Sequence, residues 1–163
     1  MLTEKILQIL ATIGMGALPI FEVRGALSVA LGLFRMNVWE AFLCAALGNI
    51  IAVSLVLRFL DPVSRFLMAR HPWWNKTITL LFNKTRHEHS KKFKEFGSLF
   101  LIGIVALPLP MAGAWLGSLI AFLFGVRYWP ALILITIGIL GAGALVSLGF
   151  QSVTSLNDWL EIW

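Results

Sequence analysis

Four long apolar blocks make up most of this 163-residue chain and strongly limit how it can fold. They cover residues 6–34, 38–60, 96–126 and 129–150. Hydrophobic residues are 59% of the sequence and charged residues 13%, against about 45–50% and about 25% in soluble domains. Blocks of this length and composition are typical of segments that span a bilayer or dip into it. The sequence therefore predicts an all-α integral membrane protein with a single membrane domain, residues 1–163.

Two of the blocks have the length of one spanning helix, and the other two are too long for one. Residues 38–60 and 129–150 are each predicted to cross the membrane once. The other two, 6–34 and 96–126, have prolines near their middle, where a helix loses a backbone donor and ends. Each half is then about 12 to 15 residues, or roughly 18–22 Å, and passes the bilayer midplane without crossing. Both blocks are predicted to be re-entrant helical hairpins.

The two halves of the chain share an order of features that indicates an internal repeat. Each has a broken hairpin, a glycine, an arginine, a tryptophan and a spanning helix, in repeats of about 5–60 and about 96–150. A glycine also follows the tryptophan by nine residues in each half, at Gly48 after Trp39 and at Gly138 after Trp129. Counting crossings makes the second repeat inverted relative to the first, a recurring plan among transporters.

A basic loop, residues 61–95, joins the two repeats. Nine of the thirteen Lys and Arg residues lie between Arg58 and Lys94. Because positive charge is retained on the cytoplasmic side, the loop is predicted to be cytoplasmic, and binding to nucleic acid is not expected.

Amphipathic interfacial helices are predicted outside the membrane blocks. Asp61 is a good helix cap and Pro62 suits a first helical position, so a new helix is expected to begin there. The tail, residues 151–163, is predicted to be a short amphipathic anchor on the outer face. The expected partners of these segments are membrane lipids.

The first break carries two charges in an otherwise apolar segment. Glu22 and Arg24 follow Pro19 and precede Gly25. Ionisable residues within a membrane are rare and indicate a functional site, here one that binds substrate or couples transport to protons or cations. The alternative is a structural ion pair that locks the tip of the hairpin.

The second break has no charge but offers backbone groups. Pro108 and Pro110 leave carbonyls without helical donors, and Gly113 lets another chain approach closely. The amides around Gly113 are expected to begin a half-helix, which favours anions. Together with the guanidinium of Arg24, they predict a site for phosphate or carboxylate.

Three further residues are candidates, two near the second break and one in the spanning block 38–60. Trp115 follows the second break and is expected to line the site. Gly117 lies four residues after Gly113, a spacing typical of close helix packing. Asn49, in the middle of 38–60, is expected to form an interhelical hydrogen bond, or alternatively to bind the substrate.

Other kinds of chemistry find little support. No nucleophile with a base, phosphate-binding loop or nucleotide fingerprint is present, so neither an enzyme nor a cofactor is expected. His87 and His89 resemble part of a metal site, but no Cys or further His completes the ligand set, so no metal site is predicted.

Two stretches resemble a known family: PIFEVRGALSVALG, residues 19–32, and ALPLPMAGAWLGSLIAFLFG, residues 106–125. They are similar to the putative small multi-drug export protein family of prokaryotic membrane proteins, over about residues 5–150. That family distantly resembles the DedA superfamily, whose members have two opposed re-entrant hairpins and some of which translocate polyprenyl-phosphate or other lipids. The resemblance places Glu22 and Arg24 at the acidic and basic positions of the first hairpin motif. The second tip departs from the DedA pattern, because it lacks the arginine that those members typically carry there.

The first expectation for function is a DedA-like transporter or lipid flippase in a prokaryotic inner (plasma) membrane. It would be coupled to protons or cations and would move an anionic substrate such as a polyprenyl phosphate. One alternative is a small multidrug exporter of cationic or amphipathic compounds, and another is a membrane scaffold that transports nothing. A homodimer is also expected, because four membrane elements enclose little volume.

Overall fold

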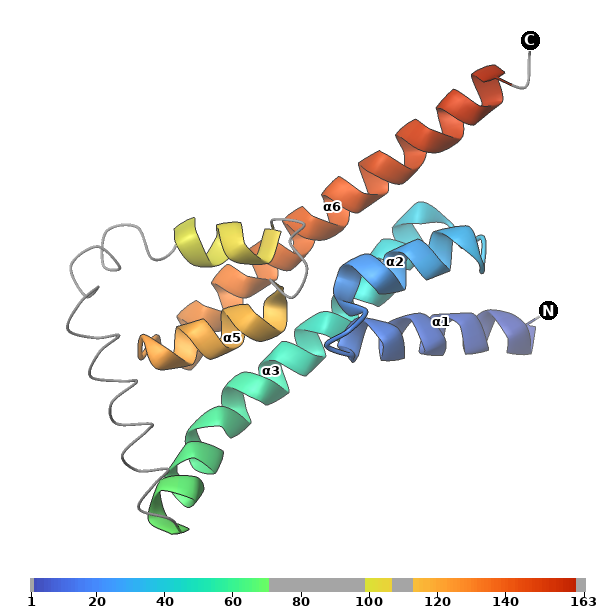
Figure 1. Ribbon diagram of the computed structural model, residues 1–163. Helices are drawn as coiled ribbons and strands as arrows, with labels where there is room; N and C mark the ends of the chain where they lie inside the picture. The colour runs from blue at the N-terminus through green and yellow to red at the C-terminus, as the bar shows by residue number, and fades with distance from the viewer. Residues whose placement is uncertain (1, 71–98, 107–112, 161–163) are drawn as a thin grey trace. The chain divides into compact units, whose positions relative to one another are not determined.

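The computed structural model describes residues 2–70, 99–106 and 113–160, and every regular element among them is a helix (Figure 1). The chain divides into two units, which are described separately below. Unit 1 comprises Met1–Ile51 and Ile139–Trp163, and unit 2 comprises Ala52–Gly138. Besides a short helix at 99–106, the helices are α1 Leu2–Ala17, α2 Glu22–Gly32, α3 Val38–Arg70, α5 Ala114–Leu123 and α6 Tyr128–Leu160.

Two of these helices are long and apolar enough to cross a membrane. The apolar parts are Val38–Ser64 of α3 and Tyr128–Val153 of α6. On α3 the outward face is a stripe of large apolar side chains, each about half exposed or more, at Leu43, Leu47, Ile51 and Leu55. The inward face of α3 is mostly alanine. Small residues inside and large apolar residues outside are the arrangement expected of helices that pack closely in lipid.

Both long helices continue past the ends that the sequence predicted. The new helix expected at Asp61 is wrong, because α3 runs without interruption to Arg70 and contains Pro62. A proline removes one hydrogen bond, yet its φ angle is helical, so a helix that is already long can continue through it. Helix α6 likewise continues to Leu160, with no Gly or Pro after Gly149 to end it. The amphipathic anchor predicted for residues 151–163 stays a prediction.

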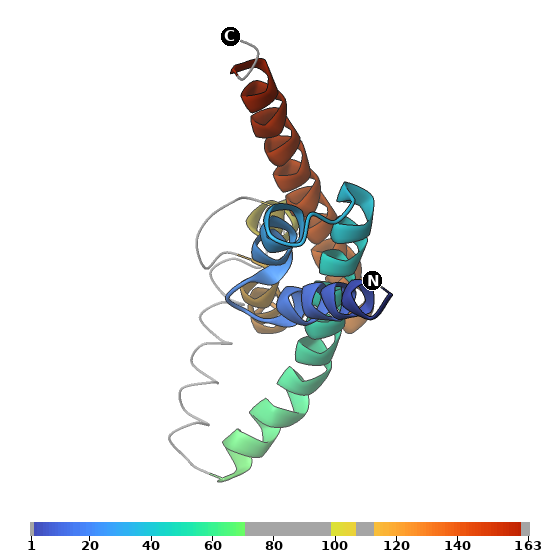
Figure 2. The same ribbon diagram turned by 90° about the vertical axis from the view of Figure 1, so that its right-hand side faces the viewer.

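The break predicted at Pro19 is confirmed. Helix α1 ends at Ala17 and α2 begins at Glu22. The residue before a proline disfavours helical backbone angles, which explains why α1 stops just before Leu18. The two helices have 16 and 11 residues, about 24 Å and about 16 Å long, so neither spans a core of about 30 Å. They pack against each other and lie side by side (Figures 1 and 2).

In unit 1, α1 crosses α3 at two glycines. A Cβ on Gly16 would overlap the carbonyl oxygen of Ala45, and one on Gly48 would overlap the carbonyl oxygen of Ile13. Each glycine therefore allows the other helix's backbone to approach directly. On the α6 side of the unit, a Cβ on Gly143 would lie 2.7 Å from the ring of Phe42.

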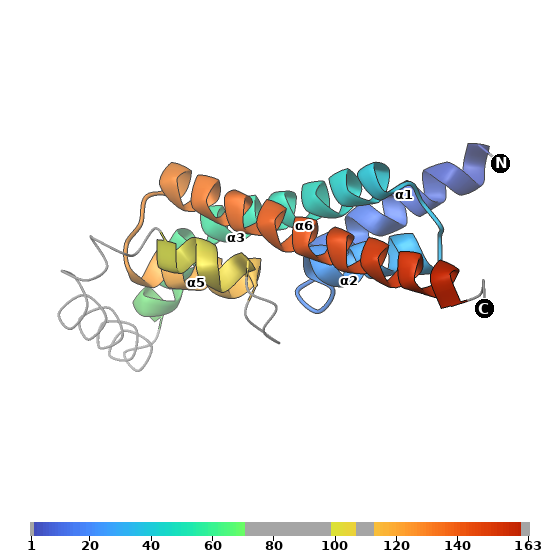
Figure 3. The ribbon, with the colours of Figure 1, turned by 90° about the horizontal axis from the view of Figure 1, so that it is seen from above.

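In unit 2, the helix of residues 99–106 lies beside α5 (Figure 3). Val105 is 2% exposed and fills the space that two glycines leave. A Cβ on Gly117 would lie 2.7 Å from Val105 Cγ2, and one on Gly138 would lie 2.6 Å from Val105 Cβ. The packing role predicted for Gly117 is thus confirmed. A hydrogen bond of 2.7 Å between the hydroxyls of Ser54 and Tyr128 joins α3 to the start of α6 in this unit.

Side-chain burial recurs along the two long helices at a spacing of 90 residues. Six buried positions of α3 have six buried counterparts on α6: Ala41, Ala45, Gly48, Asn49, Ala52 and Val53, then Ala131, Ile135, Gly138, Ile139, Ala142 and Gly143. The packing register of the first half is therefore repeated in the second. The inverted placement of the two halves in a membrane stays a prediction.

Candidate functional site

The candidate site is centred on the start of α2, directly after the break at Pro19. The turn is closed by the Glu22 amide, which donates to the Leu18 carbonyl at 2.9 Å, and by the Gly25 amide, which donates to the Phe21 carbonyl at 2.7 Å. Glu22 and Arg24 are both half-buried, in the first turn of α2. The four residues predicted at the first break thus lie in this turn and at the start of α2: Pro19, Glu22, Arg24 and Gly25.

Glu22 has an unusual backbone conformation. Its φ angle is 48°, in the left-handed region that side chains other than glycine rarely adopt. Such a conformation costs roughly 1–3 kcal/mol and is found preferentially at binding sites and switch regions. The site therefore holds one of its two charged residues on strained backbone.

The second tip is described only in part. Pro108 and Pro110 lie outside the described residues, so the predicted meeting of the two tips stays a prediction. Gly113 is buried and precedes α5 without a side-chain cap, and its carbonyl accepts from the Gly117 amide at 2.8 Å. Trp115 is half-buried in the first turn of α5. A helix thus begins directly after this glycine, as predicted, and its place in a re-entrant hairpin stays a prediction.

The two hairpins differ in the polarity of equivalent positions. Four buried residues of α2 recur 91 residues later on α5: Val23, Ala26, Leu27 and Ala30, then Ala114, Gly117, Ser118 and Ala121. In this register Gly113 corresponds to Glu22, and Trp115 corresponds to Arg24. At these two positions α2 carries charged side chains and α5 does not.

Asn49 also lies in unit 1, on the inward face of α3. Its side chain is 0% exposed, and neither its Oδ1 nor its Nδ2 has a hydrogen-bond partner. The expected interhelical hydrogen bond is therefore not formed within the described part of the chain. The alternative, a contact with substrate, stays a prediction.

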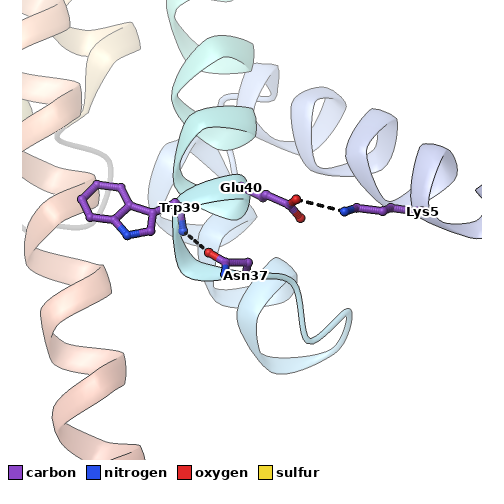
Figure 4. A network of polar contacts seen from close by, with 4 residues as sticks. All are labelled: Lys5, Asn37, Trp39 and Glu40. Atoms are coloured by element: carbon purple, nitrogen blue, oxygen red, sulfur yellow. Dashed lines mark hydrogen bonds and ion pairs between the residues drawn. The ribbon is translucent and has the colours of Figure 1, made fainter.

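One ion pair that the sequence did not predict joins α1 to α3. Lys5 Nζ donates to Glu40 Oε1 at 2.9 Å, and Asn37 Oδ1 accepts from the Trp39 amide at 3.0 Å, capping α3 (Figure 4). The two charged side chains are 56% and 45% exposed, so the pair is worth at most about 1 kcal/mol. Lys5 and Glu40 both precede, in their helices, the residues at which α1 crosses α3. Because the two side chains meet, α1 and α3 start on the same side of this crossing.

No signal for a metal centre is found in the part of the chain that the structure describes. Within it, no three His, Cys, Asp or Glu side chains lie close enough together to hold a metal ion. His87 and His89 lie outside the described residues.

A protein-family model matches most of this chain. The family model described as putative small multi-drug export protein matches residues 22–145, starting at Glu22 and including Arg24 and Asn49. No curated protein and no solved structure matches the chain. The match covers more than half of the sequence, and the two apolar helices have the length of membrane spans. This chain is therefore a membrane protein that belongs to the putative small multi-drug export protein family.

Proposed function

We propose that the protein is a membrane transporter that exports cationic or amphipathic compounds, with Glu22 as the group that binds the cation. The observation that carries this proposal is a carboxylate held on left-handed backbone at a break between two short apolar helices. The description of the family, small multi-drug export, supports the same substrate class. Few groups other than a carboxylate attract a cation into a medium of low dielectric constant.

The proposed architecture is a pair of re-entrant hairpins with opposite orientation. Its support is the short length of α1, α2 and α5, none of which spans a bilayer core of about 30 Å at about 1.5 Å per residue. Repeated burial on α3 and α6 adds support for two related halves. In such transporters the substrate binds near the midplane, where the broken helices end.

A second candidate function is a proton- or cation-coupled transporter or lipid flippase for an anionic substrate, such as a polyprenyl phosphate. Two features favour it. Arg24 is half-buried beside the break. Independently, α5 begins at Ala114, after Gly113, without a side-chain cap, which leaves first-turn amides able to bind an anion. Glu22 would then be the coupling carboxylate. The charge of the transported compound separates the two candidates.

Purified protein in liposomes tests the choice. We expect uptake of tetraphenylphosphonium, a lipophilic cation, driven by an imposed proton gradient. A labelled polyprenyl phosphate should remain in its original leaflet. Translocation of the phosphate without movement of the cation would replace the first function by the second. Failure to move either compound would contradict transport and favour a membrane scaffold.

The proposed location is the inner membrane of a prokaryote, with residues 61–95 in the cytoplasm. The support is the concentration of Lys and Arg in that loop. Replacing the single cysteine by Cys44→Ser permits labelling of one introduced thiol at a time. We expect an impermeant maleimide outside the cell to label Arg35→Cys but not Ser90→Cys. Labelling of both from the same side would contradict the crossing by α3.

A further inference from the structure

We propose that Asn49 is a substrate-binding residue that selects compounds with a neutral group able both to donate and to accept a hydrogen bond, such as a carboxamide. The inference rests on the proposed function and names a second contact for the same substrate. It starts from the burial of the side chain, which is 0% exposed, and from its two polar atoms, neither of which has a partner within the described residues.

The three other buried polar residues in the described part of the chain form hydrogen bonds within their own helices. The hydroxyl groups of Thr12, Ser118 and Ser147 each donate to the carbonyl four residues earlier, at 2.7–2.8 Å. The side chain of Asn49 does not. A buried polar group without a partner is destabilising, and within a membrane no bulk water is present to replace the partner. A bound group that supplied the missing partners would remove this cost.

Packing does not require an asparagine at this position. The counterpart of Asn49 in the repeated register is Ile139, which is also 0% exposed. A bulky aliphatic side chain thus fits this register of the helix. The neighbours on the same face of α3 are small and apolar, including Ala45 and Ala52, and offer no side-chain hydrogen bond. The amide is therefore present for a contact that the helix itself does not provide.

The surroundings of Asn49 indicate how a substrate reaches it. It follows Gly48, whose Cα faces the Ile13 carbonyl, at the crossing of α1 and α3. This backbone contact holds α1 closely against the part of α3 that carries Asn49. In this proposal the structure is a closed state, and the substrate reaches Asn49 when α1 moves away from α3.

The chemistry of the carboxamide sets the class of ligand. Oδ1 accepts and Nδ2 donates from one plane, which matches another amide or a hydroxyl better than a bare ion. A metal cation needs several oxygen ligands, and no cluster of acidic residues, His or Cys occurs in the described ranges. The expected substrate is an amphipathic cation that also carries such a neutral polar group.

Two probes that differ in one group test the proposal: tetraphenylphosphonium, which has no hydrogen-bonding group, and its derivative with a carboxamide on one ring. We expect Asn49→Leu to raise KM for the carboxamide probe about tenfold, the effect of losing a hydrogen bond in a dry site. KM for the unsubstituted probe should stay unchanged. Asn49→Ala, which cannot block the site sterically, should have the same effect, and Ser147→Ala should have none.

Thermal unfolding in detergent gives a readout independent of transport. Without a probe, Asn49→Leu should unfold at a higher temperature than the wild type, because an unsatisfied amide has been removed. The carboxamide probe should then raise the unfolding temperature of the wild type more than that of the variant. If the ratio of KM for the carboxamide probe to KM for the unsubstituted probe is the same in the wild type and in both Asn49 variants, the role proposed for Asn49 is wrong. The proposed function would be unaffected by that result. Absence of transport of both probes by the wild type would overturn the proposed function, and this inference with it.

Discussion

Glu22→Gln is expected to reduce transport of tetraphenylphosphonium at least about a hundredfold, while the protein stays folded. Two unit charges about 4 Å apart attract by about 4 kcal/mol at an effective dielectric constant near 20, and each 1.4 kcal/mol is a factor of ten. The substitution keeps the shape of the side chain and makes the same demand on the left-handed backbone at residue 22. Initial uptake rates in liposomes and the unfolding temperature measure the two effects.

A second glutamate serves as the matched control. Glu40→Gln also removes one carboxylate from unit 1, but that carboxylate is 45% exposed and paired with Lys5. We expect it to change uptake little. Arg24→Gln separates the candidate functions, since it should spare a cationic substrate and abolish transport of an anionic one. If Glu22→Gln and Arg24→Gln both fold and both keep full transport, these residues are structural and the proposed site is wrong.

Replacing either of two nearby glycines of α1 by alanine is expected to change the free energy of unfolding, in opposite directions for Gly14 and Gly16. Gly16→Ala should lower the free energy of unfolding by about 1–3 kcal/mol or more, because the new methyl group overlaps the Ala45 carbonyl. Gly14→Ala should raise it by up to about 1 kcal/mol, because no atom lies within 4 Å of the new methyl group and alanine is the better helix former. Equilibrium unfolding in mixed detergent micelles measures both.

The other side of the same crossing gives an independent check. Gly48→Ala should destabilise the protein as Gly16→Ala does, because its methyl group overlaps the Ile13 carbonyl. Gly149→Ala is its control, with nothing within 4 Å. If Gly16→Ala and Gly48→Ala are as stable as their controls, α1 does not cross α3 at these residues.

Pro19 and Pro62 show which helix ends can be predicted from local sequence and which cannot. Pro19 ended a helix as predicted, and α1 stops at Ala17. Pro62 was predicted to start a new helix and instead lies inside α3. The local cost of a proline is similar in both places. The outcomes differ because the chain reverses at Pro19, where α2 packs against α1. At Pro62 the chain continues a helix that is already about six turns long.

The candidate site was predictable in part. Charge inside an apolar block and an adjacent proline identified Glu22 and Arg24 and their place at a break. Neither the left-handed conformation of Glu22 nor the missing partners of Asn49 follow from those patterns. Nothing in the sequence linked Lys5 to Glu40, which lie 35 residues apart and meet only because α1 crosses α3.

By itself, the sequence determined the class of protein, the two long helices, the break after Ala17 and the family, because hydrophobicity, helix propensity and motif spacing depend on near neighbours in the chain. Only the tertiary structure decided which glycines allow backbones to touch, which face of α3 is buried and that Asn49 is enclosed without a partner. Burial and hydrogen bonding of a side chain depend on segments far away in the sequence. The same asparagine would be an ordinary polar residue on a helix facing water, and in this fold it is buried with neither polar atom paired among the described residues.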